Sequence, residues 1–287
     1  MGQAAVRPIE TETPVTTGVR PARKGRVEPG VLALQVLILV AVLAFWQFGT
    51  EAGIIRKFFF SQPTEVAQRL GDWFFRNRII YRHIEATFVE TVLSFVIGVF
   101  LGILFGFVMA RSELAAKVFG PYVTVLNAMP RVVLAPIFVL WFGLGQNSKV
   151  ALGVSLVFFI VFYNTFQGVR EADPRVIDKA RMLGASNWQV IRHVQFPSAM
   201  TWILSSLHTS VGFALAGVVV GEYLGSTKGI GYLVSFAEGN FDSTGVFAGM
   251  TVLAALVMVI ELSIIPVERR LLRWQPKRES GARAREV

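Results

Sequence analysis

The chain has 287 residues, of which 53% are hydrophobic, and a formal net charge of +9. Several apolar runs approach the roughly 20 residues that a helix needs to span a bilayer, so the composition predicts a polytopic membrane protein and excludes the soluble globular class. The sequence contains no cysteine, which excludes disulfides, thiolate metal sites and a cysteine nucleophile.

The first 85 residues divide into three parts. Residues 1–30 are polar, carry several basic residues and lack hydrophobic periodicity, which predicts a disordered basic tail. Residues 31–49 predict a first transmembrane anchor, because the apolar run is long for a signal-peptide core and no cleavage-site pattern follows it. Residues 50–85 are expected to form an external loop with an interfacial amphipathic helix, which Ser61 caps and in which Pro63 occupies the first turn.

The rest of the chain predicts a core of five more spans, residues 86–266, and a basic tail, residues 267–287. The approximate limits of the spans are 86–110, 122–142, 149–168, 198–221 and 246–266. Lys and Arg are more frequent in the segments on the N-terminal side of the membrane than in those on the other side. This distribution places both termini, and the polar loop 170–197, in the cytoplasm.

Glycines recur at helical spacing in two of these spans. Gly98, Gly102 and Gly106 lie four residues apart, so they form a bare stripe along one face of a helix and predict close approach of a second helix. Gly217 and Gly221 repeat the arrangement in the fifth span. The alternative is that glycine is simply common in membrane helices.

The longest polar interruption, residues 170–197, predicts two short amphipathic helices joined by a tight bend. Asp173 is a favourable N-cap before Pro174, and Gly184 ends the first helix. Ser186 and Gln189 have the spacing of a capping box, so a second helix begins at once. Two short amphipathic helices arranged in this way are suited to dock on a cytoplasmic partner.

This loop resembles the EAA loop of the membrane subunits of bacterial ATP-driven importers. Asp178-Lys179-Ala180 stands for the Glu-Ala-Ala triplet, Gly184 for the glycine that follows it, and Val194-Gln195-Phe196-Pro197 for the Ile-x-Leu-Pro ending. Lys179 departs from the family's alanine. The resemblance implies that the loop is a coupling helix seated in a groove of an ATP-binding subunit. The residues that it assigns to docking are Asp178, Lys179, Ala180, Arg181, Gly184, Ala185 and Ser186.

Further motifs are similar to those of the nitrate, sulfonate and taurine branch of this permease family. They are Met129-Pro130-Arg131, Leu140-Trp141-Phe142-Gly143-Leu144-Gly145, Gly221-Glu222-Tyr223-Leu224-Gly225, Phe241-Asp242-Ser243-Thr244-Gly245-Val246-Phe247 and Glu268-Arg269-Arg270-Leu271. The resemblance implies an all-α protein with six transmembrane helices and the type I importer permease fold, located in the bacterial inner membrane. The implied solute is a small oxyanion such as a sulfonate, taurine or nitrate, while pyrimidine precursors and aromatic carboxylates stay open.

The resemblance also implies the partners. They are a second permease copy, two cytoplasmic ATP-binding subunits and an external substrate-binding protein. The chain has no phosphate-loop motif, so we expect ATP to bind the partner subunit and this chain to be no enzyme and to carry no cofactor. We expect no metal site, because the chain has three histidines and no cysteine, and no nucleic-acid partner, because it has no basic helix or aromatic platform.

Polar residues within spans indicate the translocation path, because a charge in hydrocarbon is costly. Arg131 follows Pro130, which frees a backbone carbonyl near Asn127. Arg131 then either meets a travelling anion or satisfies the freed carbonyls. His208 and Glu222 are the other candidates for the path or a gate.

Two other classes of protein stay open. An ion-coupled secondary transporter would need acids at mid-span, whereas the acids of this chain lie near span ends. A membrane enzyme is the other alternative, in which Ser205, Ser206, His208 and Ser210 would form a hydrolytic site. They lack a G-x-S-x-G elbow or a matched acid, so pathway lining or helix contact is the better interpretation.

Overall fold

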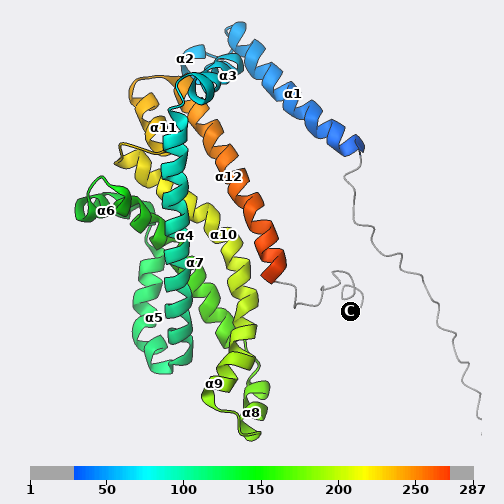
Figure 1. The fold of residues 1–287 in the computed structure, drawn as a ribbon, viewed down its shortest axis with the longest axis vertical. Helices are drawn as coiled ribbons and strands as arrows, with labels where there is room; N and C mark the ends of the chain where they lie inside the picture. The colour runs from blue at the N-terminus through cyan, green and yellow to red at the C-terminus, as the bar shows by residue number, and fades with distance from the viewer. Residues whose placement is uncertain (1–28, 272–287) are drawn as a thin grey trace, which may run out of the picture.

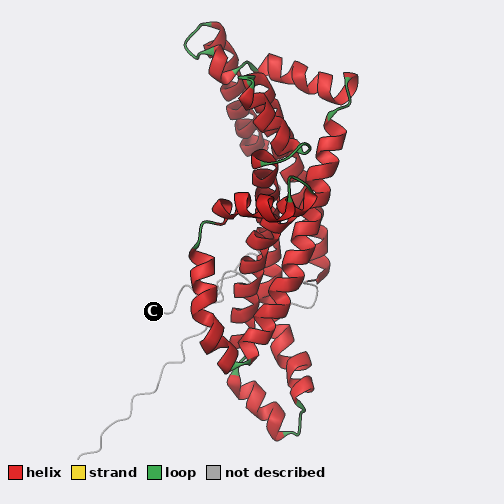
Figure 2. Ribbon diagram, turned by 90° about the vertical axis from the view of Figure 1, so that its left-hand side faces the viewer, coloured by secondary structure: helices red, strands yellow, loops and turns green. Residues whose placement is uncertain are grey.

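The structure is a computed structural model that describes the backbone of residues 29–271 and the side chains of residues 30–263. Every regular element in these ranges is a helix, and Figure 2 shows no strand in this part of the chain. The elements are α1 (Pro29–Glu51), α2 (Lys57–Phe60), α3 (Pro63–Gly71), η1 (Asp72–Arg76), α4 (Ile80–Arg111), α5 (Glu113–Ala128), η2 (Arg131–Leu134), α6 (Ala135–Phe142), α7 (Gln146–Arg170), α8 (Pro174–Met182), α9 (Asn187–Val190), η3 (Ile191–Gln195), α10 (Phe196–Leu224), α11 (Ile230–Gly239) and α12 (Ser243–Leu271). Residues 1–28 and 272–287 of the predicted tails lie outside the described residues, whereas residues 29–30 belong to α1 and residues 267–271 to α12, so the helices extend further than predicted.

The centre of the molecule is formed by α4, α7 and α10, and the predicted glycine stripe of α4 packs against α7 (Figure 1). A Cβ atom on Gly98 would lie 2.6 Å from the Cβ of Val157, and one on Gly102 would lie 2.8 Å from that of Val161. A Cβ on Gly106 would come within 2.7 Å of a backbone oxygen of α7. The helix-contact prediction for this stripe is therefore confirmed.

The second glycine pair brings α10 against α7, at a point where Gly153 of α7 also meets Ser94 of α4. A Cβ on Gly217 would lie 2.7 Å from the Cα of Gly153 on α7, and one on Gly221 would lie 3.0 Å from the side chain of Lys149. Because glycine faces glycine here, the two backbones approach more closely than larger side chains would permit. α7 is thus held between two helices.

The predicted third span, 122–142, is a broken one. α5 and the η2–α6 pair meet at an angle of 90° around Met129 and Pro130. Proline has no N–H and disfavours helical dihedrals in the residue before it, and Met129 is extended (φ −68°, ψ 134°). Pro130, which the sequence indicates as freeing a backbone carbonyl, therefore lies at a full break between two helices. Five described helices are long and apolar enough to cross a membrane, and a sixth crossing results if the bent pair is counted as one span.

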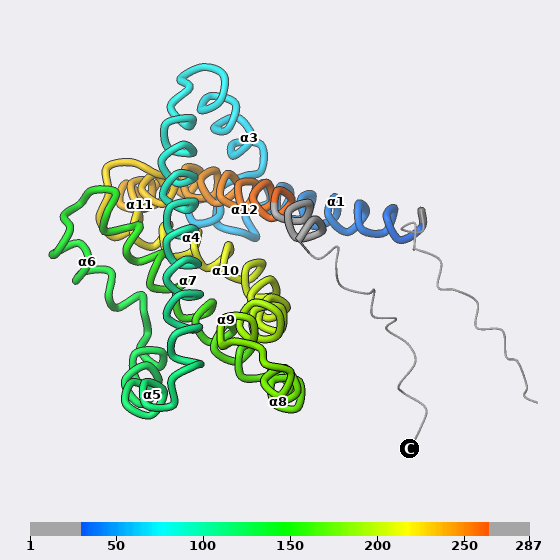
Figure 3. Tube along the Cα trace, turned by 60° about the horizontal axis from the view of Figure 1, so that its bottom comes forward, coloured from blue at the N-terminus to red at the C-terminus, as the bar shows by residue number. Residues whose placement is uncertain are grey.

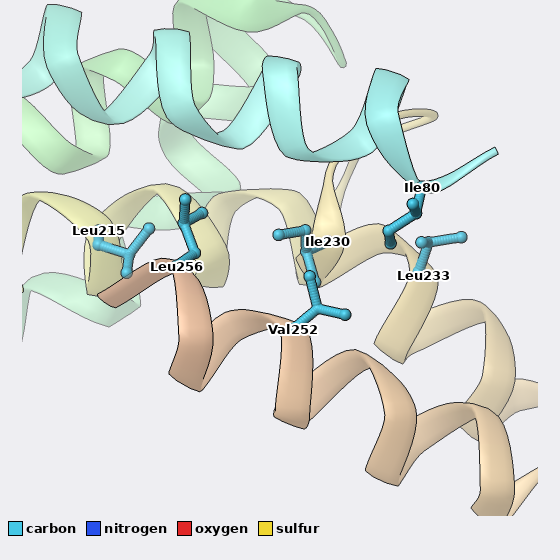
Figure 4. Packing of buried hydrophobic residues seen from close by; sticks show 6 residues of the cluster. All are labelled: Ile80, Leu215, Ile230, Leu233, Val252 and Leu256. Carbon is cyan, nitrogen blue, oxygen red and sulfur yellow. The ribbon is translucent and has the colours of Figure 1, made fainter. Parts of the chain in front are cut away.

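The end of the molecule that holds α3, α11 and the first turns of α4 and α12, here called the distal end, has its own apolar core. Figure 4 shows the six buried side chains that meet there from α4, α10, α11 and α12. They are Ile80, Leu215, Ile230, Leu233, Val252 and Leu256. This core fixes α11 and the turn before it against α4.

The segment predicted as an interfacial helix packs against α12. Ser61 does not cap it: its hydroxyl lies 2.7 Å from that of Thr244 at the start of α12, and Gln62 occupies the N-cap position of α3 without a side-chain bond. The helix ends near Arg76, and α4 begins at Ile80, earlier than the predicted 86. Because its hydroxyl contacts α12, Ser61 is not available to cap α3.

The first span, α1, is directed away from the bundle in Figures 1 and 3. Most of its large apolar side chains are exposed within the chain, as Leu37 at 64% and Phe45 at 66% illustrate. Such exposure is expected of a helix that contacts lipid or another subunit.

Candidate functional site

Residues 171–195, here called the two-helix segment, form the end of the molecule opposite the distal end (Figure 1). The Asp173 carboxylate accepts a hydrogen bond of 2.8 Å from the N–H of Arg175, which confirms Asp173 as the N-cap of α8. α8 ends in a Schellman motif, in which the N–H of Ala185 donates to Ala180 at 3.0 Å and that of Gly184 donates to Arg181 at 2.9 Å. Gly184 ends α8 as predicted and has φ +84°, the left-handed conformation that glycine adopts without strain.

The start of the second helix of the segment is fixed by hydrogen bonds between its N-cap residue and the third residue after it. The Ser186 hydroxyl accepts from the N–H of Gln189 at 3.3 Å, and the Gln189 side chain accepts from the N–H of Ser186 at 2.7 Å. The predicted capping box is therefore present. Both helices of the segment are thus defined by local contacts.

The tip of the two-helix segment exposes large apolar side chains next to basic ones. Met182 is 87% exposed, Leu183 88% and Trp188 66%. Arg175, Lys179, Arg181 and Arg192 are exposed around them. An apolar tip within a basic rim is typical of a surface that binds another protein.

Of the seven residues assigned to docking, five are exposed on this segment. They are Asp178, Lys179, Arg181, Gly184 and Ser186. Ala180 and Ala185 are half-buried, where they close the Schellman motif. Met182 was not predicted as a docking residue from the sequence. Its position next to Leu183, just before the glycine that ends the helix, could have indicated it.

A group of buried polar residues lies at the distal end and is here called the distal polar cluster: Thr87 and Glu90 of α4, Lys149 of α7 and Glu222 of α10. The Lys149 ammonium donates to Glu90 Oε1 at 2.7 Å and to the Ser226 hydroxyl at 3.0 Å. Both charged side chains are about 4% exposed. A pair this deeply buried needs such hydrogen bonds to offset its desolvation.

Glu222 is fully buried in the same cluster. Its Oε1 lies 2.7 Å from the Thr87 hydroxyl, and its Oε2 accepts from the N–H of Gly231 at 2.7 Å. A Cβ on Gly229 (φ +110°) would collide with the Glu222 carboxyl, and one on Gly231 would lie 2.5 Å from the Val219 carbonyl oxygen. These two glycines therefore let the turn between α10 and α11 close over the carboxyl group.

At the break in the third span, Arg131 is anchored by Asn127. Its Nη2 donates to the Asn127 carbonyl at 3.1 Å and also to the Asn127 side-chain oxygen. Its guanidinium lies 4.6 Å from the centre of the Phe159 ring of α7. Its Nε atom is buried without a hydrogen-bond partner.

Residues 98–273 match the family "Binding-protein-dependent transport system inner membrane component". The chain belongs to this family of importer permeases. The permease is 29% identical over 248 residues to the taurine transport system permease protein of Escherichia coli, covering 85% of this chain and 90% of that one.

A second relative has a different solute in its name. The permease is 29% identical over 241 residues to the formylaminopyrimidine transport permease protein of Halalkalibacterium halodurans, with 84% of this chain and 95% of that one covered. In structure, it is similar to a chain of a bacterial ABC transporter involved in the import of the polysaccharide alginate, with a TM-score of 0.57 and 18% identity over 83% of this chain and 96% of that one. The fold is that of the type I ABC importer permeases.

The five candidate path residues of the permease do not form one group. Asn127, Pro130 and Arg131 meet at the break of the third span. His208 is exposed on α10, and Glu222 is buried at the distal end. Their roles in transport stay predictions.

The permease has a cavity of about 430 Å³ at the distal end, between the first turns of α4 and α7 and the turn before α11. Arg82, Lys149 and Lys228 supply positive charge to its lining, and Glu85 and Glu90 supply negative charge. The sequence reasoning missed Lys149 and Arg82 as site residues. These residues come from segments far apart in the chain, so no local motif could have grouped them.

Proposed function

We propose that this permease forms the translocation path of an ATP-driven importer and that its two-helix segment docks on a cytoplasmic ATP-binding subunit. The exposed apolar tip, with Met182, Leu183 and Trp188 inside a basic rim, is the observation that carries the proposal. Burying three such side chains in a partner groove would contribute several kcal/mol, at about 25 cal/mol per Å² of apolar surface. With this segment in the cytoplasm, both termini lie there too. ATP is bound and hydrolysed on the partner.

The stoichiometry of the proposed complex is two permeases and two ATP-binding subunits. One permease chain offers one two-helix segment, whereas paired ATPases present two docking grooves. A closed two-fold arrangement of two copies of this chain satisfies both. An external binding protein would then deliver solute to the distal end.

The proposed solute is a small oxyanion, such as a sulfonate, taurine or nitrate. The distal cavity supports this proposal, because Arg82 and Lys228 line it without any ion pair inside the described part of the chain. Arg131 supplies a further cation at the span break. The name of the Escherichia coli relative favours a sulfonate, and that of the Halalkalibacterium relative keeps pyrimidine precursors as the competing class.

Reconstitution tests this proposal directly. We expect proteoliposomes that contain the permease, its ATP-binding subunit and the binding protein to take up labelled taurine or nitrate only when ATP is supplied on the side of the two-helix segment. Met182→Asp, which places a charge at the apolar tip, is expected to abolish co-purification of the ATP-binding subunit. Phe75→Asp, at an 83% exposed aromatic residue of the distal end, is the matched control and keeps it. Uptake without ATP, or equal loss in both variants, would contradict the proposal.

A further inference from the structure

The distal polar cluster holds two acids and one base in a site closed to solvent. Glu90 and Lys149 are about 4% exposed, and Glu222 is 0% exposed. Lys149 forms its ion pair with Glu90, and Glu222 takes part in no ion pair among the described residues. If both acids were ionised, the cluster would carry one uncompensated negative charge away from water, which is strongly unfavourable.

The hydrogen bonds around Thr87 indicate how this charge is removed. The Thr87 hydroxyl has one hydrogen but two candidate acceptors, Glu222 Oε1 at 2.7 Å and the His83 carbonyl at 3.1 Å. It also accepts from the N–H of Ile230 at 2.9 Å. One hydrogen cannot serve both acceptors well, so an ionised Glu222 leaves one of these short contacts without a proton.

A proton on Glu222 Oε1 satisfies each of the three contacts of the Thr87 hydroxyl. The Glu222 carboxyl then donates to the Thr87 hydroxyl, and Thr87 donates to the His83 carbonyl, while still accepting from Ile230. Glu222 Oε2 continues to accept from the N–H of Gly231. The charge of the cluster becomes zero, with Lys149 balanced by Glu90 alone.

The neighbouring acid reinforces this assignment. Glu90 lies three residues after Thr87 on the same face of α4, and its charge acts on Glu222 across the cluster. Glu90 Oε2 is buried and has no hydrogen-bond partner. Two carboxylates that share one buried cluster with a single lysine do not both ionise readily. The other charged group that acts on Glu222 is Lys149 of α7, while His83 of α4 is bonded to Gly229.

We propose that the Glu222 carboxyl is a proton-binding site in the folded permease and that, in its neutral form, Glu222 positions the turn of residues 225–231. This turn carries Thr227 and Lys228, which line the distal cavity. Loss of the proton would place a second negative charge beside Glu90 in the buried cluster and would remove the hydrogen that Glu222 supplies to Thr87.

Infrared spectroscopy of the complex in lipid nanodiscs tests the proposal. We expect the wild-type complex at neutral pH to show the C=O stretching band of a protonated carboxylic acid that Glu222→Gln removes. Glu85→Gln, at an exposed acid of α4, is the matched control and keeps that band. Absence of the band in the wild type, or its persistence in Glu222→Gln, would overturn the proposal.

A stability profile against pH gives the second readout. Gln has the shape of a neutral Glu and an amide that can donate to Thr87, so Glu222→Gln should keep uptake per complex within about twofold at neutral pH. The wild type should lose thermal stability as pH rises through the titration of Glu222, whereas the variant should lose less. In Glu90→Gln, Glu222 is the only acid of the cluster left to balance the buried Lys149, so Glu222 should ionise and this variant should lose the carboxylic acid band as well. Identical alkaline profiles for the wild type and Glu222→Gln would refute the assignment.

Discussion

Arg69 of α3 and Asp242, the residue before α12, form an ion pair with 2.5 Å between Nη1 and Oδ2. Each side chain is about one-third exposed. The pair joins segments 173 residues apart and, with the Ser61–Thr244 contact, fixes α3 on α12. The position of the predicted interfacial helix therefore depends on a distant turn.

The first prediction is that acid weakens the contact between α3 and α12. Burial by itself would raise the pKa of the Asp242 carboxyl, but the Arg69 guanidinium and the N–H groups of Gly245 and Thr244 outweigh it, so this pKa lies below its ordinary value. A carboxyl with a lowered pKa stabilises the fold above its unfolded pKa of about 3.9, and this contribution is lost as pH falls through the folded pKa. The protection factors of α3 amides against hydrogen exchange should therefore fall below about pH 4.

Two variants test whether Asp242 causes this dependence on acid. Asp242→Asn should give fast α3 exchange already at neutral pH and remove its acid dependence. Asp72→Asn, which affects a long and exposed pair with Arg76, is the control and should leave the profile unchanged. Acid-dependent exchange that survives in Asp242→Asn would show that another group is responsible.

The second prediction concerns the bend of the two-helix segment. Gly184 has φ +84° and open space around the position of a Cβ atom, so the backbone conformation alone limits substitution. Gly184→Val should cost about 1–2 kcal/mol of local stability, because a β-branched residue strongly disfavours the left-handed region. The measurement is ATPase activity of the reconstituted complex, which should no longer respond to loaded binding protein.

The matched control at this position is Gly184→Asn, because asparagine tolerates the left-handed region. It should keep most of the stimulated activity. Wild-type stimulation in Gly184→Val would exclude the two-helix segment as the coupling element.

The third prediction concerns the contact of α4 with α7. A methyl group at Gly102 would lie 2.8 Å from the Val161 Cβ and 3.0 Å from the Phe158 carbonyl oxygen, so Gly102→Ala should force the helices apart at a cost of about 1–3 kcal/mol. The melting temperature of the purified permease should fall. Gly120→Ala, in the open part of α5, is the control and should leave it unchanged or raise it slightly. Equal melting temperatures for Gly102→Ala and the wild type would contradict close packing.

The fourth prediction separates two roles of Arg131. If this residue meets a travelling anion, Arg131→Gln should lower uptake per assembled complex, and Arg131→Lys should restore part of it by keeping the charge. If Arg131 only holds the Asn127 carbonyl at the span break, both variants should mainly reduce the amount of assembled complex. Uptake normalised to complex recovered in detergent distinguishes these outcomes. Normal uptake per complex in Arg131→Gln would remove Arg131 from the anion path.

The sequence by itself determined the features that depend on neighbouring residues. Asp173, Gly184 and the Ser186–Gln189 box were identified because caps and helix ends are formed by contacts within about five residues. The apolar runs predicted the spans, since a bilayer requires long apolar helices whatever they pack against. The glycine stripe of α4 predicted a close helix contact, although not that α7 would be the partner.

Only the tertiary structure decided the features that join distant segments. The 90° angle at Pro130 follows from how α6 packs on α7, because proline permits a break but does not set its direction. Ser61 could have capped α3, yet its hydroxyl is used by Thr244. The distal polar cluster combines residues of α4, α7 and α10, and each of them alone resembles an ordinary polar residue near a span end. The role of these residues depends on their burial and on the charges of their neighbours in the cluster. No local sequence pattern encodes either of these.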